Sequence, residues 1–261
     1  TPLHQLLRSN ELSDSMQQAL LPIVTQLLKL APAQVTTRDQ SQAQALHVVL
    51  THPAYTSEQI LSLLQALSQA KADINAANYH GDTPLLLAIQ REKWEVVRWL
   101  IRQGASSQAT NQYGANALHL LIARQQEDWV ANLIEHGNDV RQADHNGDTA
   151  LHYLARSRCK GEACATQTAI LKQLLQHGAL IDAPNLDGET PLFLCTYHHN
   201  TTLAKQLLAQ KANPNQTNTL GEQPLIVSLN QTAWDLADLL IQAGAPLEQA
   251  NWEGKTALQL L

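Results

Sequence analysis

The chain has 261 residues, of which 44% are hydrophobic and only 15% are charged, and its formal net charge is −6. Because nucleic acids are polyanions, this charge disfavours nonspecific binding to DNA or RNA, and no basic stripe of useful length is visible. No apolar run approaches the roughly 20 residues that a membrane-spanning helix needs. The sequence therefore predicts neither a nucleic-acid partner nor a membrane span within this chain.

A short element recurs along the chain and marks the start of a predicted helix each time. In chain order it reads Thr1-Pro2-Leu3-His4, Gln44-Ala45-Leu46-His47, Thr83-Pro84-Leu85, Asn116-Ala117-Leu118-His119, Thr149-Ala150-Leu151-His152, Thr190-Pro191-Leu192, Gln223-Pro224-Leu225 and Thr256-Ala257-Leu258. Thr can cap a helix, and Pro suits its first turn because no helical bond needs the missing N–H. Successive elements lie 43, 39, 33, 33, 41, 33 and 33 residues apart, which indicates an internal repeat.

Other residue types keep the same phase. A turn glycine stands two residues before the element at Gly81, Gly114, Gly147, Gly188, Gly221 and Gly254. Asn or Asp stands five residues before it at Asp39, Asn78, Asn111, Asp144, Asn185, Asn218 and Asn251. Twelve residues before it, Gly104, Gly137, Gly178 and Gly244 suit the left-handed residue that closes a helix, and Lys71 and Lys211 replace them in two repeats. Apolar stripes such as Leu203, Leu207 and Leu208 predict a second amphipathic helix in each repeat.

Together these positions resemble the ankyrin-repeat family, in which a β-turn precedes a T-P-L-H-x-A helix and a second helix ends in L-L-x-x-G-A. The match covers essentially the whole chain, strongly from Thr83 onward and in degenerate form before it. The resemblance implies an all-α solenoid of helix-turn-helix units joined by β-hairpin loops. We expect one domain over residues 1–261 with about six complete units and partial units at its ends. The motif histidines His4, His47, His119 and His152 are expected to make hydrogen bonds to turns.

Three intervals exceed 33 residues, and the extra residues fall between the two helices of a unit, near 8–15, 52–57 and 157–164. We expect them to project from one side of the solenoid. The third insertion holds Cys159 and Cys164 in a polar stretch, which allows free thiols, a zinc half-site or a local disulfide. We favour the disulfide, which persists only in an oxidising compartment. Cys195 occupies an apolar helix position and is expected in the core.

The sequence contains no phosphate-binding loop, no dinucleotide-binding glycine motif and no nucleophile elbow. The adjacent His198 and His199 have no acidic or cysteine partner at a useful spacing. We therefore predict a protein that is not an enzyme and that has no cofactor and no catalytic or metal-binding residues.

The resemblance implies that a partner protein binds the hairpin tips and the exposed ends of the first helices, in a concave groove from about Tyr79 to Trp252. The predicted contact residues are Tyr79, His80, Arg91, Tyr113, Arg124, His145, Arg156, Leu186, Tyr197, His198, Leu220 and Trp252. Asp82 and Asp148 also occupy tip positions. Aromatic and Arg side chains are the types enriched at the centres of protein interfaces.

Three functions fit such a module, and the fold alone does not choose among them. The favoured one is a binder that inhibits or neutralises its partner in a bacterial periplasm or cell envelope, because low charge, abundant Gln, Asn and Thr and the cysteine pair suit that compartment. The chain is similar in this respect to envelope-located immunity proteins against secreted toxins such as lipase effectors. The alternatives are a cytosolic adaptor or a secreted effector that recruits a host protein, and a recognition domain of a larger enzyme or channel.

Overall fold

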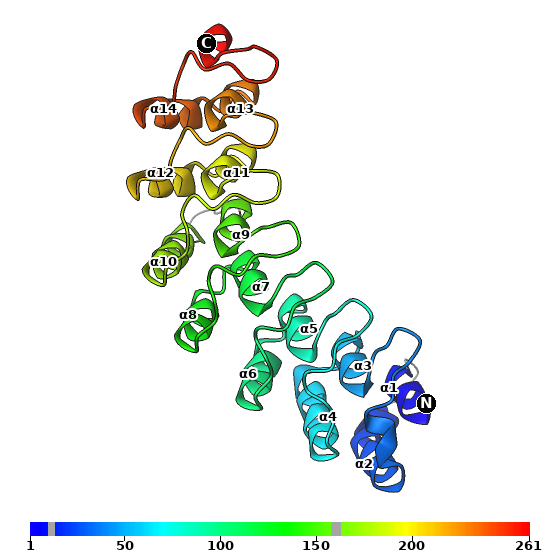
Figure 1. The fold of residues 1–261 in the computed structure, drawn as a ribbon. Coiled ribbons are helices and arrows are strands. Elements are labelled where there is room, and N and C mark those ends of the chain that lie inside the picture. Colours follow the sequence, from blue (N-terminus) through cyan, green and yellow to red (C-terminus); the bar gives the residue numbers. More distant parts are fainter. Residues whose placement is uncertain (10–13, 158–162) are drawn as a thin grey trace. The chain divides into compact units, whose positions relative to one another are not determined.

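The computed structural model describes residues 1–9, 14–157 and 163–261. These residues form 15 α-helices and one short 3-10 helix (Figure 1). Their only strand-like pairings are two isolated bridges, Ala143 with Thr149 and Ala250 with Thr256, each of which closes a hairpin. The predicted all-α repeat architecture is confirmed. The chain divides into two compact units, Thr1–Ala117 and Leu118–Leu261, and each is described by itself.

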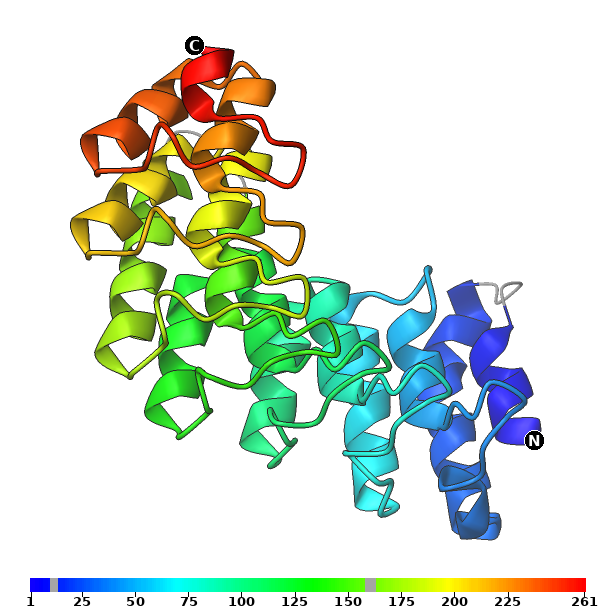
Figure 2. The same cartoon turned by 45° about the horizontal axis from the view of Figure 1, so that its top comes forward.

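The first unit contains three pairs of helices. Its elements are α1 (Pro2–Arg8), α2 (Asp14–Leu30), η1 (Pro32–Val35), α3 (Ala45–Thr51), α4 (Ser57–Gln69), α5 (Pro84–Gln90) and α6 (Trp94–Arg102). The first helices α1, α3 and α5 pack against one another beside the loops, and the second helices α2, α4 and α6 form a layer behind them (Figures 1 and 2).

The second unit repeats this two-layer arrangement. Its elements are α7 (Ala117–Ala123), which begins at the last residue of the first unit, then α8 (Glu127–Glu135), α9 (Ala150–Arg156), α10 (Ala163–Gln176), α11 (Pro191–Tyr197), α12 (Thr201–Ala209), α13 (Pro224–Asn230), α14 (Trp234–Gln242) and α15 (Ala257–Leu260). The helices α9, α11 and α13 pack in sequence on the loop side, and α8, α10, α12 and α14 pack in sequence behind them.

The helices begin and end as the repeated residues predict. The hydroxyl of Thr83 accepts a hydrogen bond from the Leu86 N–H at the start of α5, and Pro84 occupies the first turn. Gly104 follows α6 with a left-handed φ of 82°. Lys71 and Lys211 adopt the same conformation, with φ of 65° and 66°, although only glycine enters this region without a steric cost.

The core of each unit lies between its two helix layers. In the second unit Leu203 and Leu207 of α12 and Phe193 of α11 are buried. Removing a side chain of this size from water contributes roughly 1.5–3 kcal/mol to stability. Cys195 is a buried free thiol, so its predicted core position is confirmed, and burial raises its pKa.

The second insertion, between α3 and α4, does not project as a free loop. Tyr55 is only 4% exposed, and its hydroxyl donates a hydrogen bond to the Leu7 carbonyl at 3.0 Å. The Tyr55 ring also stacks on His52, with 4.0 Å between the ring centroids. Burying the Tyr55 ring against α1 stabilises the fold more than leaving the ring in water, which explains why the side chain points inward.

The other two insertions include residues 10–13 and 158–162, which the structure does not describe. Cys159 is one of them, so the predicted disulfide with Cys164 lies outside the described residues and stays a prediction. The number of domains and of complete repeats also stays a prediction. Within the described ranges, no helix combines the length and the apolar character needed to cross a bilayer.

Candidate partner-binding surface

The phased Asn and Asp residues shape the hairpin tips. The Asn78 Oδ1 atom accepts hydrogen bonds from the backbone N–H groups of His80 and Asp82, at 2.9 and 3.0 Å. The same pair of bonds occurs at the tips that begin with Asn111, Asp144, Asn185, Asn218 and Asn251. A side chain that bonds its own backbone two and four residues on mimics a turn, so each tip has a fixed local shape.

Neighbouring tips are joined by backbone hydrogen bonds. The Gln112 N–H donates to the His80 carbonyl at 2.7 Å in the first unit, and the Thr219 N–H donates to the Asp187 carbonyl at 2.8 Å in the second. The tips approach so closely that a Cβ atom on Gly81 would lie 2.8 Å from the Gln112 nitrogen. Because the tips are ordered before binding, less conformational entropy is lost when a partner docks on them.

The motif histidines connect the first helices to the following hairpins. The Nε2 atom of His47 lies 3.0 Å from the Ala76 carbonyl and 3.1 Å from the Asp82 carbonyl. His4, His119 and His152 make corresponding contacts with the carbonyls of Ala43, Gln142 and Glu189. The predicted turn hydrogen bonds are therefore confirmed. Burial lowers the pKa of His47, His119 and His152.

The first unit presents aromatic tips. Tyr79 and Tyr113 are 67% and 63% exposed. The His80 ring stands edge-on to Tyr79 at a centroid distance of 5.6 Å, and its Nδ1 atom lies 3.2 Å from the Gln112 Oε1 atom. Arg91 is exposed directly after α5. The first unit thus places two phenol rings and a guanidinium on its loop side.

The second unit presents aliphatic side chains and an indole at its tips. Leu186, Leu220 and Trp252 are 73%, 61% and 69% exposed. Tyr197 is exposed at the end of α11, where its ring lies 6.0 Å from that of Phe193. Of the other predicted contact residues, His145 and Arg156 are exposed, and Arg124 and His198 are half-buried.

Two of the tip residues, Asp82 and Asp148, are buried. The Gln90 amide donates to Asp82 at 2.8 Å, and the Asp148 side chain, which has no exposed surface, forms an ion pair with Arg156. Asn185 from the next hairpin also donates to Asp148, at 3.0 Å. A buried carboxylate needs such donors to replace water. These contacts fix the ends of α5 and α9 to their own hairpins.

Tyr153 is a further member of this buried cluster that sequence reasoning missed. Its hydroxyl donates to the Asp144 carboxylate at 2.9 Å, and its ring lies 4.8 Å from that of His119. Burial and this hydrogen bond raise the pKa of Tyr153. For the aspartate contacts, the available signal was the separation of eight residues between Asp82 and Gln90, which recurs between Asp148 and Arg156.

The geometry describes a helical repeat protein with large apolar and aromatic side chains gathered on ordered hairpin tips. Among the described residues, no group of three or more His, Cys, Asp or Glu side chains could hold a metal ion. Models of the ankyrin-repeat family match residues 93–166 (three copies), 61–101 (many copies) and 187–219 (a single repeat). Together these matches cover more than half of the chain, which is an ankyrin-repeat protein.

One curated relative supports the same family. An ankyrin repeat protein of Rickettsia bellii (strain RML369-C) is 51% identical over 39 residues, which are 15% of this chain and 23% of the relative. The chain therefore matches less than a quarter of that protein. Ankyrin repeats are generally protein–protein interaction modules and typically not enzymes.

Proposed function

We propose that this protein binds a partner protein through its hairpin tips and first-helix ends, and that binding inhibits or neutralises the partner. The observation that carries the proposal is the exposure of five large side chains on hydrogen-bonded tips. They are Tyr79, Tyr113, Leu186, Leu220 and Trp252, each between 61% and 73% exposed. They occupy two adjacent positions of the repeat, and large water-exposed side chains held side by side in this way are typical of protein interfaces.

Arginine side chains add a polar component to this surface. Arg156 is 37% exposed while Asp148 holds its guanidinium, so little rotamer freedom remains to be lost on binding. Arg91 and Arg124 share a position with each other in two other repeats, one residue further along the repeat than Arg156. Guanidinium groups recognise carboxylates through paired hydrogen bonds, so we expect acidic residues on the partner surface. The concave groove from Tyr79 to Trp252 is the expected location of the partner.

The finer part of the proposal is an immunity-type role in a bacterial periplasm or envelope, against a secreted toxin such as a lipase effector. Low charge and the Cys159–Cys164 pair support it. The intact mass of natively isolated protein before and after alkylation tests this part, because free thiols at both positions would contradict it. A cytosolic adaptor and a host-directed effector then become the favoured alternatives, together with a recognition domain of a larger enzyme or channel.

The contact surface is tested by substitutions at the tips. Partner captured from a periplasmic extract with the intact protein is titrated against Tyr113→Ala, Leu220→Ala and the parent. Truncating a central anchor should weaken binding by about 2 kcal/mol or more, roughly 30-fold in the dissociation constant, while the melting temperature stays unchanged.

Two exposed residues on second helices provide matched controls. Arg98→Ala in α6 and Lys205→Ala in α12 remove charged side chains from the layer behind the loop side. Both controls should bind like the parent. Equal binding by the Tyr113 and Leu220 variants would show that the tips are not the contact surface.

A further inference from the structure

Two repeats join the last acidic residue of a hairpin to the end of their own first helix. The Gln90 amide donates to Asp82, and the Arg156 guanidinium forms an ion pair with Asp148. In both cases the acid directly precedes the repeated element, and its donor stands eight residues beyond it. Each carboxylate therefore finds a donor inside its own repeat, and both aspartates are buried.

Two later repeats keep the acidic residue but lack this donor. Glu189 and Glu222 directly precede the repeated element, and both are half-buried. The residues eight positions beyond them are Tyr197 and Asn230. Within the described ranges neither of these forms a hydrogen bond with the glutamate of its repeat. The two carboxylates thus lie on the loop side without the donor that the aspartates have at the helix end.

Each glutamate keeps one hydrogen bond from its own hairpin. The Asn185 amide donates to the Glu189 Oε2 atom at 3.2 Å, and the Asn218 amide donates to the Glu222 Oε2 atom at 3.0 Å. The Oε1 atoms accept no hydrogen bond from the described residues, and neither is buried, so both can be reached from outside. Burial raises the pKa of Glu189, and the neighbouring Asp187 charge raises it further. A positive charge brought to this carboxylate would therefore be stabilised.

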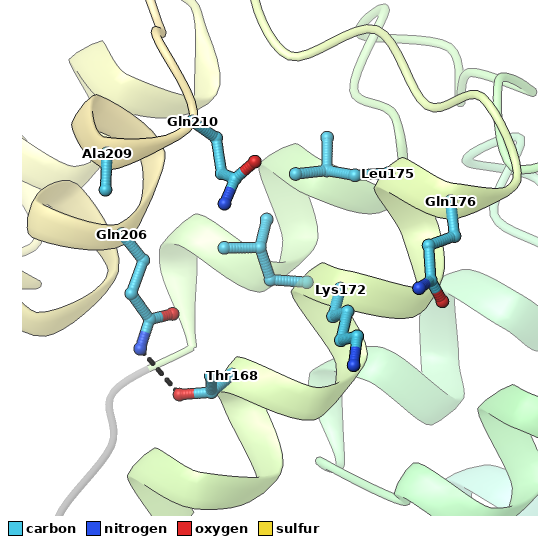
Figure 3. Close-up of a pocket in the computed structure, with 8 residues that line it drawn as sticks. Thr168, Lys172, Leu175, Gln176, Gln206, Ala209 and Gln210 are labelled. Atoms are coloured by element: carbon cyan, nitrogen blue, oxygen red, sulfur yellow. Dashed lines mark hydrogen bonds between the residues drawn. The ribbon is translucent and has the colours of Figure 1, made fainter.

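Negative charge is gathered on the hairpins of these two repeats. The hairpins, residues 179–189 and 212–222, contain four carboxylates and no lysine or arginine. The preceding second helices α10 and α12 have the opposite charge, because they contain Lys172 and Lys205 and no acidic residue. Lys172 is also the only charged residue that lines the recess between α10 and α12 (Figure 3). A basic partner is therefore attracted to the loop side and not to the layer behind it.

Apolar side chains stand at the tips of the same two hairpins. Leu186 and Leu220 are strongly exposed there, and the Tyr197 ring is exposed at the end of α11. An arginine side chain has an apolar stem, a guanidinium that forms paired hydrogen bonds with a carboxylate, and a flat face that stacks on aromatic rings. Leucine, carboxylate and phenol groups together therefore fit an arginine of the partner better than a lysine.

We propose that the partner protein places one arginine side chain beside Glu189 and another beside Glu222, from a segment whose apolar residues contact Leu186 and Leu220. The guanidinium at Glu189 also stacks on the Tyr197 ring. This inference rests on the proposed tip interface and names the chemistry of the partner that meets these two hairpins. It adds basic residues to a partner surface that is expected to be acidic opposite the arginines of the earlier repeats.

The test uses the peptide acetyl-Arg-Leu-Leu-Arg-amide. Packed helices lie roughly 8–10 Å apart and three extended residues span roughly 10 Å, so its two arginines match the spacing of neighbouring repeats. The peptide is titrated at low salt into ¹⁵N-labelled protein of the full 261 residues, and amide shifts are followed. We expect saturable shifts in residues 185–190 and 218–223 with a dissociation constant of about a millimolar. The same peptide with citrulline for both arginines has no charge and should bind about tenfold more weakly or worse.

Substitutions locate the two contacts. Glu189→Gln and Glu222→Gln keep the hydrogen bond within the hairpin but remove the charge, and each should weaken peptide binding about fivefold. Tyr197→Arg supplies a donor eight residues after Glu189, so it should occupy that carboxylate and weaken binding by a similar factor. The matched control is Asp235→Asn, which removes an exposed carboxylate from α14 and should leave binding unchanged.

Three outcomes would overturn the proposal. They are the absence of saturable shifts in the two hairpins, equal affinity for the arginine and citrulline peptides, and parent-like binding by the double variant of Glu189→Gln and Glu222→Gln. Tyr113→Ala should weaken binding of the partner protein and leave the peptide titration unchanged. A partner that responds to Tyr113→Ala while the peptide does not bind contradicts this inference alone, and the reverse result contradicts the tip interface.

Discussion

The two compact units have different side chains at corresponding positions of one repeat. The tips of the first unit are aromatic, with Tyr79 and Tyr113, whereas those of the second unit include Leu186, Leu220 and Trp252. The connection between a tip and its first helix also differs. It is a hydrogen bond from the uncharged Gln90 amide to Asp82 in the first unit, and an ion pair of Arg156 with Asp148, joined by Asn185, in the second.

The backbone of the hairpins does not share this variation. Both units use an Asn or Asp that accepts two N–H groups, a glycine of positive φ, and a hydrogen bond from one tip to the next. The comparison shows that the shape of the tip is set by residues whose hydrogen bonds and φ values are internal to the hairpins. The exposed residues between them can therefore differ without a change of fold.

Substituting a tip glycine in either unit should have the largest effect. Gly81→Ala and Gly188→Ala should each lower the free energy of unfolding by about 3 kcal/mol, because the φ values of 73° and 75° are costly for alanine and the new Cβ would lie 2.8 Å from the next tip. Urea denaturation of the full chain measures both. Gly244→Ala is the control, since its φ is 88° but its Cβ meets open space, and about 1 kcal/mol is expected. Clearly unequal losses at Gly81 and Gly188 would contradict a common tip backbone.

Removing Asp82 or Asp148 should lower the free energy of unfolding by different amounts in the two units. Asp148→Ala should cost about 2 kcal/mol, because Arg156 and Asn185 lose a buried acceptor, although the part-exposed guanidinium can still turn to water. Asp82→Ala should cost about 1 kcal/mol, since only the hydrogen bond from the uncharged Gln90 amide is lost. The same denaturation experiment compares the two variants, and equal losses would mean that the ion pair of Arg156 adds nothing beyond the bond that an amide supplies.

Acidification should affect the two units alike. Each unit has two histidines whose pKa is lowered by burial, His47 and His52 in the first and His119 and His152 in the second. Histidines in the unfolded chain take up protons near their ordinary pKa of 6.5, while the buried ones do not. Stability is therefore complete above that pH and is lost as the pH falls below it, by at most about 1.4 kcal/mol per histidine at pH 5.5.

Hydrogen exchange of amides in α3 and α9 between pH 7.5 and 5.5 checks this equality. After correction for intrinsic exchange rates, protection should fall by similar amounts in the two helices. His152→Phe, which introduces the residue found at the same repeat position in Phe193, should reduce the pH dependence in α9 and leave it unchanged in α3. Loss of protection confined to one unit in the parent protein would contradict the prediction.

The fold could be predicted because its determinants are local and periodic. A positive φ requires Gly104, and a hydrogen bond within its own turn requires Asn78. Residues of both kinds recur in phase along the chain. The exposure of Tyr79 and Trp252 followed from their repeat positions alone. The burial of Asp148 could not be predicted this way, because it depends on Asn185 in another hairpin.

The close contact between hairpin tips also restricts how a gene for such a protein can change in length. A residue added to a tip would have to fit where Gly188 already leaves no room for a Cβ beside Thr219, and it would break the bond from the Thr219 N–H to the Asp187 carbonyl. Residues added between the two helices of a repeat disturb no such contact. The three extra segments, near 8–15, 52–57 and 157–164, lie at that junction and at the start of the second helix: α2, α4 and α10 have 17, 13 and 14 residues, whereas α6, α8, α12 and α14 have 9 each. The tips from Asn78 onward therefore keep a constant length, and the extra residues lengthen the junctions and the second helices that follow them.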